Sequence, residues 1–233
     1  KLGSGTLIWE GNGVYSGTSF VNNGTLQITE GASIQASIGV AADAVLQSCG
    51  NVGGLDVYGE VIPGCSGSSA TAYVNGSVIM RGGSYLSMNI GNQNNSTVVV
   101  YGDVIIEDGA VVNFTLTPDY NRVNNVVTFL YSHALSGHFD PARILINSPL
   151  IQPIISQSGG NLSVGLNVAN FTQKIVNNNN AVAVGQAIYN LAVAGDPIAG
   201  SLISSLIGLG EMGDIVTALN EMHPALYKGL TLS

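Results

Sequence analysis

A short unit that recurs along the first 110 residues constrains the fold more than any other feature of the sequence. Each copy consists of a turn residue, a glycine, a polar residue and then apolar residues, largely in alternation. The copies begin at Asn23-Gly24, Tyr58-Gly59, Asn75-Gly76 and Tyr101-Gly102. Irregular repeats of about 20–30 residues with short strands are typical of the coils of a solenoid.

The alternation separates residues expected in the core from residues expected at the surface. Glycine permits the positive φ that a tight corner between strands needs. The side chains expected to stack between neighbouring coils are Leu26, Ile28, Val78, Met80, Val104 and Ile106. The outward positions carry Thr25, Gln27, Ser77 and Asp103. Residues 1–170 are therefore predicted to be almost wholly β, in a parallel solenoid.

The pattern changes twice in the second half of the chain. Residues 126–131 form a buried-type run and residues 161–166 alternate again, which predicts a solenoid end with a hairpin-like cap. After an Asn-rich break at 177–180, apolar residues recur at helical spacing over 212–222. A further helix is expected before Asp196-Pro197, from the spacing of Val184, Ile188, Leu191 and Ala192, and Pro197 is well placed at a helix start. Residues 47–54 and 91–96 are predicted to be loops that bulge from the coils.

Composition and charge exclude several classes of partner. Charged residues make up 9% of the chain, against about 25% in ordinary soluble proteins, and the formal net charge is −8. Nucleic acids and anionic membranes both require clustered Lys and Arg, so neither is an expected partner. A surface low in charge but rich in Asn, Ser and Thr is typical of a secreted or surface-exposed β protein.

The two cysteines, Cys49 and Cys65, are too few for a zinc site, which needs about four ligands. The redox spacing Cys-x-x-Cys is absent. We expect a structural disulfide that closes a surface loop, and two free buried thiols are the alternative.

Targeting signals are not evident in the sequence. No signal peptide begins at Lys1, and the chain starts within a motif, so we expect an excised fragment. Asp196-Pro197 divides the apolar stretch 181–210 into pieces shorter than the ~20 residues that a membrane span needs.

Three segments resemble one family. Residues 5–28, with Tyr15-Ser-Gly17-x-x and Asn23-Gly24-Thr-Leu26, resemble the passenger-associated repeat of bacterial autotransporters. Leu135-Ser-Gly137-His-Phe139-Asp140 is similar to a turn in the last passenger segment, the autochaperone region. Residues 214–227 look like the helical stretch that leads into the membrane barrel of such proteins, although His223-Pro224 departs from the usual sequence of that stretch.

The resemblance implies an all-β fold: a right-handed parallel β-helix (β-solenoid) with a capping hairpin-like end and a small C-terminal helical segment. It implies passenger coils over 1–110, an autochaperone-like end over 111–170, an Asn-rich linker over 171–180 and a helical segment over 181–233. Leu135, Gly137 and Phe139 would then be the folding residues.

The function implied is that of a passenger, secreted or displayed at the bacterial cell surface, whose C-terminal part promotes folding and secretion across the outer membrane. Its partners would be its own outer-membrane β-barrel, outside this chain, and the outer-membrane assembly machinery. The passenger would serve an adhesin or virulence factor that contacts a host receptor or glycan. Two alternatives stay open: a fragment of a polysaccharide-degrading β-helix enzyme, and a glycan- or receptor-binding module that uses loops 47–66 and 91–96.

Candidate chemistry is sparse, and we expect no enzyme, no catalytic residue, no metal site and no cofactor. His133 and His138 flank a predicted turn near Asp140, but a zinc site would need a third ligand, so all three are expected at the surface. Glu107 and Asp108 are adjacent, and neighbours in a strand point to opposite faces. A carboxylate pair of the kind that cleaves polysaccharides, with Glu10 as another member, is therefore not expected.

Overall fold

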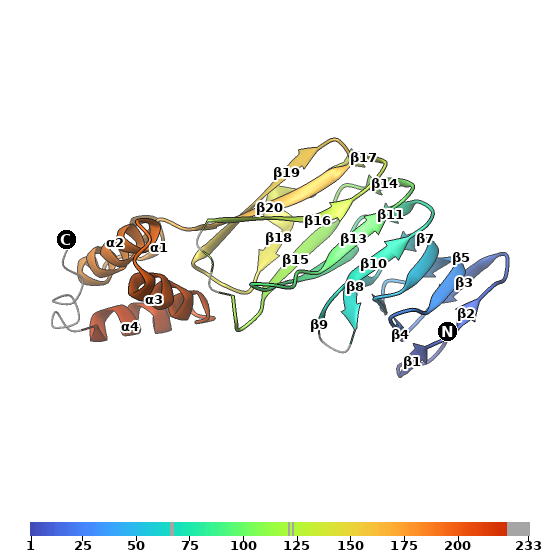
Figure 1. The fold of residues 1–233 in the computed structure, drawn as a ribbon, viewed down its shortest axis with the longest axis horizontal. Coiled ribbons are helices and arrows are strands. Elements are labelled where there is room, and N and C mark those ends of the chain that lie inside the picture. Colours follow the sequence, from blue (N-terminus) through green and yellow to red (C-terminus); the bar gives the residue numbers. More distant parts are fainter. Residues whose placement is uncertain (66–67, 121, 123, 223–233) are drawn as a thin grey trace. The chain divides into compact units, whose positions relative to one another are not determined.

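The fold is mostly β, with helices near the C-terminus (Figure 1). The structure is a computed structural model that describes residues 1–65, 68–120, 122 and 124–222. The chain divides into two compact units. The strand unit comprises residues 1–117, 126–146 and 153–165, and the helical unit comprises 118–125, 147–152 and 166 onwards.

One sheet of the strand unit, sheet A, is built from parallel neighbours that are distant in sequence. Its strands follow the order β1 (Thr6–Trp9), β4 (Gly24–Ile28), β6 (Ala44–Ser48), β8 (Glu60–Cys65), β12 (Tyr85–Ile90), β15 (Val111–Leu116) and β18 (Ile144–Ile146), with the short β9 (Ser68–Ser69) antiparallel to β8. Each strand on this path pairs in parallel with the next.

The second sheet, sheet B, is curled because two of its strands each pair with two different strands along the same edge. Its members are β2 (Asn12–Gly13), β3 (Thr18–Val21), β5 (Ser33–Val40), β7 (Asn51–Val57), β10 (Thr71–Val74), β11 (Val78–Met80), β13 (Thr97–Val100), β14 (Asp103–Ile106), β16 (Asn125–Tyr131), β17 (Ala134–Gly137), β19 (Ile151–Ser158) and β20 (Asn161–Val168). Strand β7 pairs with β10 through residues 51–52 and with β11 through residues 55–57. Strand β5 pairs in the same divided way with β2 and β3.

The core of the strand unit consists of ladders in which each rung is an apolar residue of one strand above its register partner in the next. In sheet A one ladder runs through Leu7, Leu26, Leu46, Val61, Leu86, Val112 and Ile144. In sheet B another runs through Ile38, Leu55, Val78, Val104 and Leu135. All six side chains predicted to point inward are buried, so the alternation located the core correctly.

The loop predicted at 47–54 is wrong, because residues 44–48 belong to β6 and residues 51–57 to β7. The glycines of this stretch allow close approach of neighbouring backbone segments, Gly53 within β7 and Gly50 at the bend between β6 and β7. A Cβ on Gly53 would overlap the carbonyl oxygen of Gln35, and one on Gly50 would overlap that of Ala32. The segment 91–96 contains no strand, although an isolated bridge joins Ile90 to Asn95.

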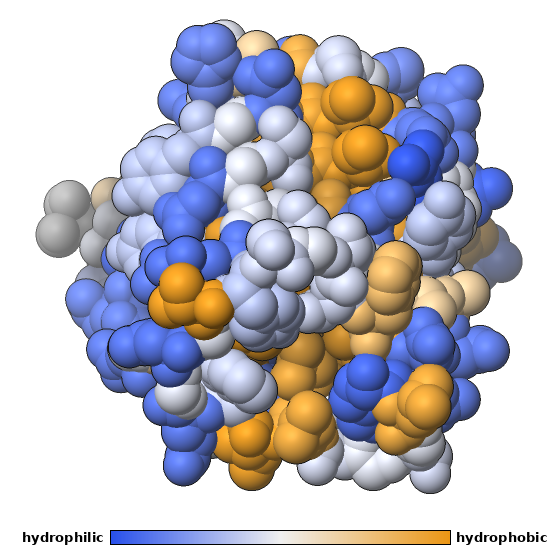
Figure 2. Space-filling view, turned by 90° about the vertical axis from the view of Figure 1, so that its right-hand side faces the viewer, coloured by the Kyte–Doolittle hydropathy of each residue, from blue (hydrophilic) through white to orange (hydrophobic). Residues whose placement is uncertain are grey.

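The first strands are the least buried part of the strand unit. Leu7 is 45% exposed, Ile8 54% and Phe20 59%. Figure 2, which looks at the side that carries these strands, shows apolar patches between polar residues. Later strands bury their apolar residues more fully. Phe114 of β15 and Phe129 of β16 are both fully buried and pack edge to face, with ring centroids 5.2 Å apart.

Strands β19 and β20 are neighbours at the end of the sheet B order, joined through Gly159-Gly160. A two-residue connection between paired strands is a hairpin. Strand β20 continues sheet B beyond β16, and the Thr128 and Ser163 hydroxyls lie 2.8 Å apart between these two strands.

The helical unit contains α1 (Phe171–Lys174), α2 (Asn179–Val193), α3 (Pro197–Ile207) and α4 (Met212–Glu221). Two of these helices begin at capping side chains: at α2 Asn178 accepts from the Ala181 N–H, and at α3 Asp196 accepts from the N–H groups of Ile198 and Ala199. The expected linker 171–180 thus includes α1 and the start of α2. In the part of the chain that is described, no helix is long and apolar enough to cross a membrane.

Candidate functional site

Cys49 and Cys65 are joined by a disulfide, with their Cα atoms 5.6 Å apart. Cys49 follows β6 directly and Cys65 ends β8, so the bond links two neighbouring strands of sheet A. It closes a loop that contains β7, a strand of the other sheet. The bond therefore fixes two neighbouring strands of sheet A and closes the segment of chain that leaves sheet A for β7 and returns to it.

The residues expected to promote folding lie at the last parallel rungs of the strand unit. Leu135 pairs with Val104, and Gly137 pairs with Ile106, both between β14 and β17. Gly137 has a φ of +80°, and a Cβ there would overlap the carbonyl oxygen of Ile106. Phe139, two residues later, is 4% exposed. The three residues thus combine a ladder end, a tight turn and a buried ring.

The histidine cluster does not form. His133 Nδ1 lies 3.0 Å from Asp103 Oδ1 on the neighbouring strand, and both side chains are exposed. Asp140 instead accepts a hydrogen bond from the Ala142 N–H and caps the short 3-10 helix Pro141–Arg143. Within the described ranges, no three His, Cys, Asp or Glu side chains gather as a possible metal site. His223 lies outside the described residues.

Glu107 is occupied by structural contacts. Its Oε1 accepts from Arg81 Nη1 at 2.8 Å, and its Oε2 accepts from the Gly82 N–H at 3.2 Å. Asp108 lies in the turn after β14. Glu10 follows β1 directly, near the N-terminus. The structure therefore does not bring Glu107 and Glu10 together.

A groove of about 590 Å³ lies on the outer surface of β3, β5, β7 and β11. We call it the β5 groove. Its floor consists of the outward positions of β5 and the residue after it: Ser37, Gly39 and Ala41. All three are small. The Phe20 ring covers Gly39, and the groove opens beside it.

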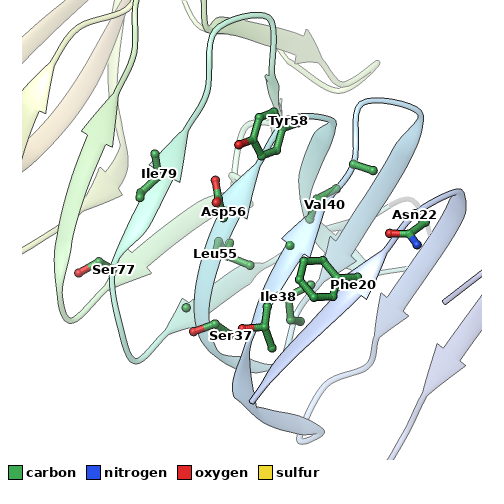
Figure 3. A pocket seen from close by; sticks show the side chains of 14 residues that line it. Phe20, Asn22, Ser37, Ile38, Val40, Leu55, Asp56, Tyr58, Ser77 and Ile79 are labelled. Carbon is green, nitrogen blue, oxygen red and sulfur yellow. The ribbon is translucent and has the colours of Figure 1, made fainter. Parts of the chain in front are cut away.

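Aromatic residues border the floor on both sides (Figure 3). Phe20 of β3 pairs with Gly39, and Gly39 pairs with Asp56 of β7. Because neighbouring strands are about 4.8 Å apart, Phe20 and Asp56 are separated by about 10 Å across the floor. Tyr58 follows β7 on the same side as Asp56, and it is 52% exposed.

An ion-pair network fixes the Asp56 side of the groove. Arg81 donates to both carboxylate oxygens of Asp56, at 2.7 and 3.1 Å, and to Glu107 at 2.8 Å. The guanidinium also lies 5.5 Å from the centre of the Tyr58 ring, within the range of a cation–π contact. The hydrogen bonds from Asp56 and then Glu107 raise the pKa of Arg81 above its usual range. Asp56 and Tyr58 are thus held in place before any ligand arrives.

The sequence analysis missed this groove. Phe20 and Tyr58 belong to different turns of chain, and only the strand register places Gly39 between them. One signal was present in the sequence. Phe20 is an apolar aromatic residue at an outward strand position, and only a residue without a side chain, here Gly39, fits opposite it. A Cβ on Gly39 would lie 2.8 Å from the Phe20 ring.

Comparison of the chain with protein-family models and with curated proteins finds no match.

Proposed function

We propose that the strand unit is a right-handed parallel β-helix and that it serves as the passenger of a bacterial autotransporter. Three strands would make each coil, one from sheet A and two from the halves of sheet B. The observation that carries the proposal is the ladder from Leu7 to Ile144, in which every rung belongs to a successive return of the chain to sheet A. A stacked coil of this kind can lengthen without a new core, which suits a surface stalk.

The secretory role that we propose belongs to the C-terminal coils. In this account residues 111–170 emerge first at the cell surface, fold, and present β15, β16 and β17 as templates for the coils before them. Folded coils cannot slide back through a narrow pore, so each added coil drives the next. The outer-membrane barrel and its assembly machinery would be the partners in this process, at the bacterial cell surface.

The packing of the terminal coils supports this role. Phe114 and Phe129 fill the interior of the terminal coils. Their buried side chains are larger than the aliphatic side chains of the earlier ladders. Burial contributes about 25 cal/mol for each Å² of apolar surface removed from water. A coil with such a core needs less help from its neighbours than the first coil, whose strand β1 is largely exposed.

An export assay tests the proposal. The chain is fused to an outer-membrane barrel in a Gram-negative host, and the surface-exposed fraction is measured as the fraction cleaved by added protease. Leu135→Asp places a charge at a core ladder position and is expected to reduce that fraction severalfold. Ser136→Thr, at the exposed neighbouring position, is the matched control and is expected to leave it unchanged.

Two results would count against the proposal. Equal export of Leu135→Asp and the parent chain would contradict the proposed role of the terminal coils in secretion. A far-ultraviolet circular dichroism spectrum dominated by helix would contradict the proposed β-helix fold.

A further inference from the structure

We propose that the β5 groove binds a neutral oligosaccharide of equatorially substituted pyranose rings, with ring faces stacked on Phe20 and Tyr58. This site lies on a sheet face; it includes residues 54–56 and Tyr58 from the segment 47–66 and none from 91–96. It does not depend on the secretory role proposed above. Its volume of about 590 Å³ lies in the range of ordinary small-ligand sites.

Exposed aromatic rings supply the first argument. Phe20 is 59% exposed and Tyr58 52% exposed, even though the Phe20 ring lies against Gly39 and the Tyr58 ring lies beside the Arg81 guanidinium. Two aromatic rings left in water beside an open groove mark a binding surface more often than scattered apolar residues do. The faces of an equatorially substituted pyranose carry only C–H bonds, which suit contact with a flat ring.

The charges of the groove favour a neutral ligand. Arg81 is shared between Asp56 and Glu107, so each charge near the groove already has a partner within 3.1 Å. A charged ligand would have to break this network, whereas hydroxyl groups can donate to the remaining carboxylate lone pairs. Ser37 and Ser77 add further hydroxyls along the groove. An anionic ligand would also be repelled by the chain's net charge of −8.

The strand pairing argues against an extended peptide. Peptides commonly bind sheets by adding a strand to a free edge. Strand β5, which forms the floor, pairs with β3 on one side and with β7 on the other. A peptide in the groove would therefore find no backbone partner on the floor, and ligand recognition rests on side chains.

Calorimetric titration of the intact chain with cellotetraose, tetra-N-acetylchitotetraose and xylotetraose, all neutral and equatorially substituted, tests the proposal. At least one of the three is expected to bind with one site per chain. Phe20→Ala is expected to weaken that binding about fivefold to tenfold, the value of one aromatic contact. Ala41→Leu, which fills the floor without adding a ring, is expected to weaken it at least as much. Tyr101→Ala is the matched control, because Tyr101 is 61% exposed but lies outside the groove.

Three outcomes would overturn the proposal. The first is failure of all three neutral tetrasaccharides to bind. The second is equal loss of binding in Tyr101→Ala and Phe20→Ala, which would place the sugar elsewhere. The third is tighter binding of anionic tetragalacturonate than of any neutral probe, which would contradict the charge argument. Circular dichroism of each variant shows whether it has kept the parent fold. Tyr58→Ala replaces Phe20→Ala if that variant has not, and the same weakening is expected because Tyr58 is the other stacking ring.

Discussion

Gly137 lies against the carbonyl oxygen of Ile106 with a φ of +80°, so that a methyl group at this position would meet both a strained backbone and a neighbouring strand. Few positions in the chain combine both constraints. The pair joins the last parallel strand of its series, β17, to β14 at the turn that precedes Phe139.

Gly137→Ala is therefore expected to lower the free energy of unfolding by 2 kcal/mol or more, since the left-handed conformation alone costs about 1–2 kcal/mol. Gly31→Ala provides the control, because Gly31 has a φ of +78° but open space around its Cα. Gly31→Ala should lower the free energy of unfolding only by the cost of the left-handed backbone conformation. Urea denaturation of both variants measures the difference, and equal losses would show that the contact with Ile106 is unimportant.

Phe139→Ala is expected to lower the free energy of unfolding by about 3–5 kcal/mol, because the ring is 4% exposed and its removal leaves a cavity. Phe20→Ala makes the same chemical change at a ring that is 59% exposed, and its effect on stability should be much smaller. Chemical denaturation compares the two. A small loss for Phe139→Ala would mean that its ring does not close the end of the core.

Reduction of the Cys49–Cys65 disulfide is expected to lower the free energy of unfolding by about 3 kcal/mol, the chain-entropy value for a loop of about 15 residues. The sequence separation here is 16. Denaturation with and without reductant measures the change. The double variant Cys49→Ala/Cys65→Ala should be insensitive to reductant, and a parent chain equally insensitive would contradict a stabilising bond.

Stability at high pH reports on Tyr120 in the helical unit. Burial raises the pKa of Tyr120 to about 12, and the side chain is 3% exposed. Below about pH 10 the phenol is protonated in both the folded and the unfolded chain, so the contribution of Tyr120 to the free energy of unfolding is fully present. Above that pH the unfolded chain releases the proton more readily, and the free energy of unfolding falls as the pH rises toward 12.

The variant Tyr120→Phe separates this contribution from that of the other tyrosines. Its free energy of unfolding should decline less steeply between pH 10 and 12 than that of the parent, as about 2 pH units lie between the two pKa values. Denaturation at a series of pH values measures the slopes. Identical slopes would mean that Tyr120 titrates as it does in the unfolded chain.

Local patterns in the sequence located the core and indicated parallel strands, but not the register between the strands. Alternation placed Leu26 and Val78 inside, since period-2 patterning depends only on neighbouring residues. The same local logic failed over residues 47–54, which were predicted to be a loop. Gly50 and Gly53 are needed there because the backbone of Ala32 and of Gln35 passes where a Cβ would lie, and that contact involves residues distant in sequence.

The β5 groove could not be predicted for the same reason. It exists because Phe20, Gly39 and Asp56 share one rung, and that register depends on the lengths of the turns between β3, β5 and β7. Helix starts were easier to predict, since Asp196-Pro197 carries both the cap and the first helical residue within two positions. Features that depend on contacts across coils need the structure, whereas features fixed by adjacent residues do not.

Native-state hydrogen exchange on the intact chain, followed by mass spectrometry, tests directly whether the C-terminal coils are the stable template. Strands β4 and β6 are compared with β15 and β16, because strands of both pairs have partners on both sides. The proposed mechanism predicts that amides of β15 and β16 exchange more slowly than those of β4 and β6, by a margin that Leu135→Asp removes. Slower exchange in β4 and β6 would contradict folding from the C-terminal end.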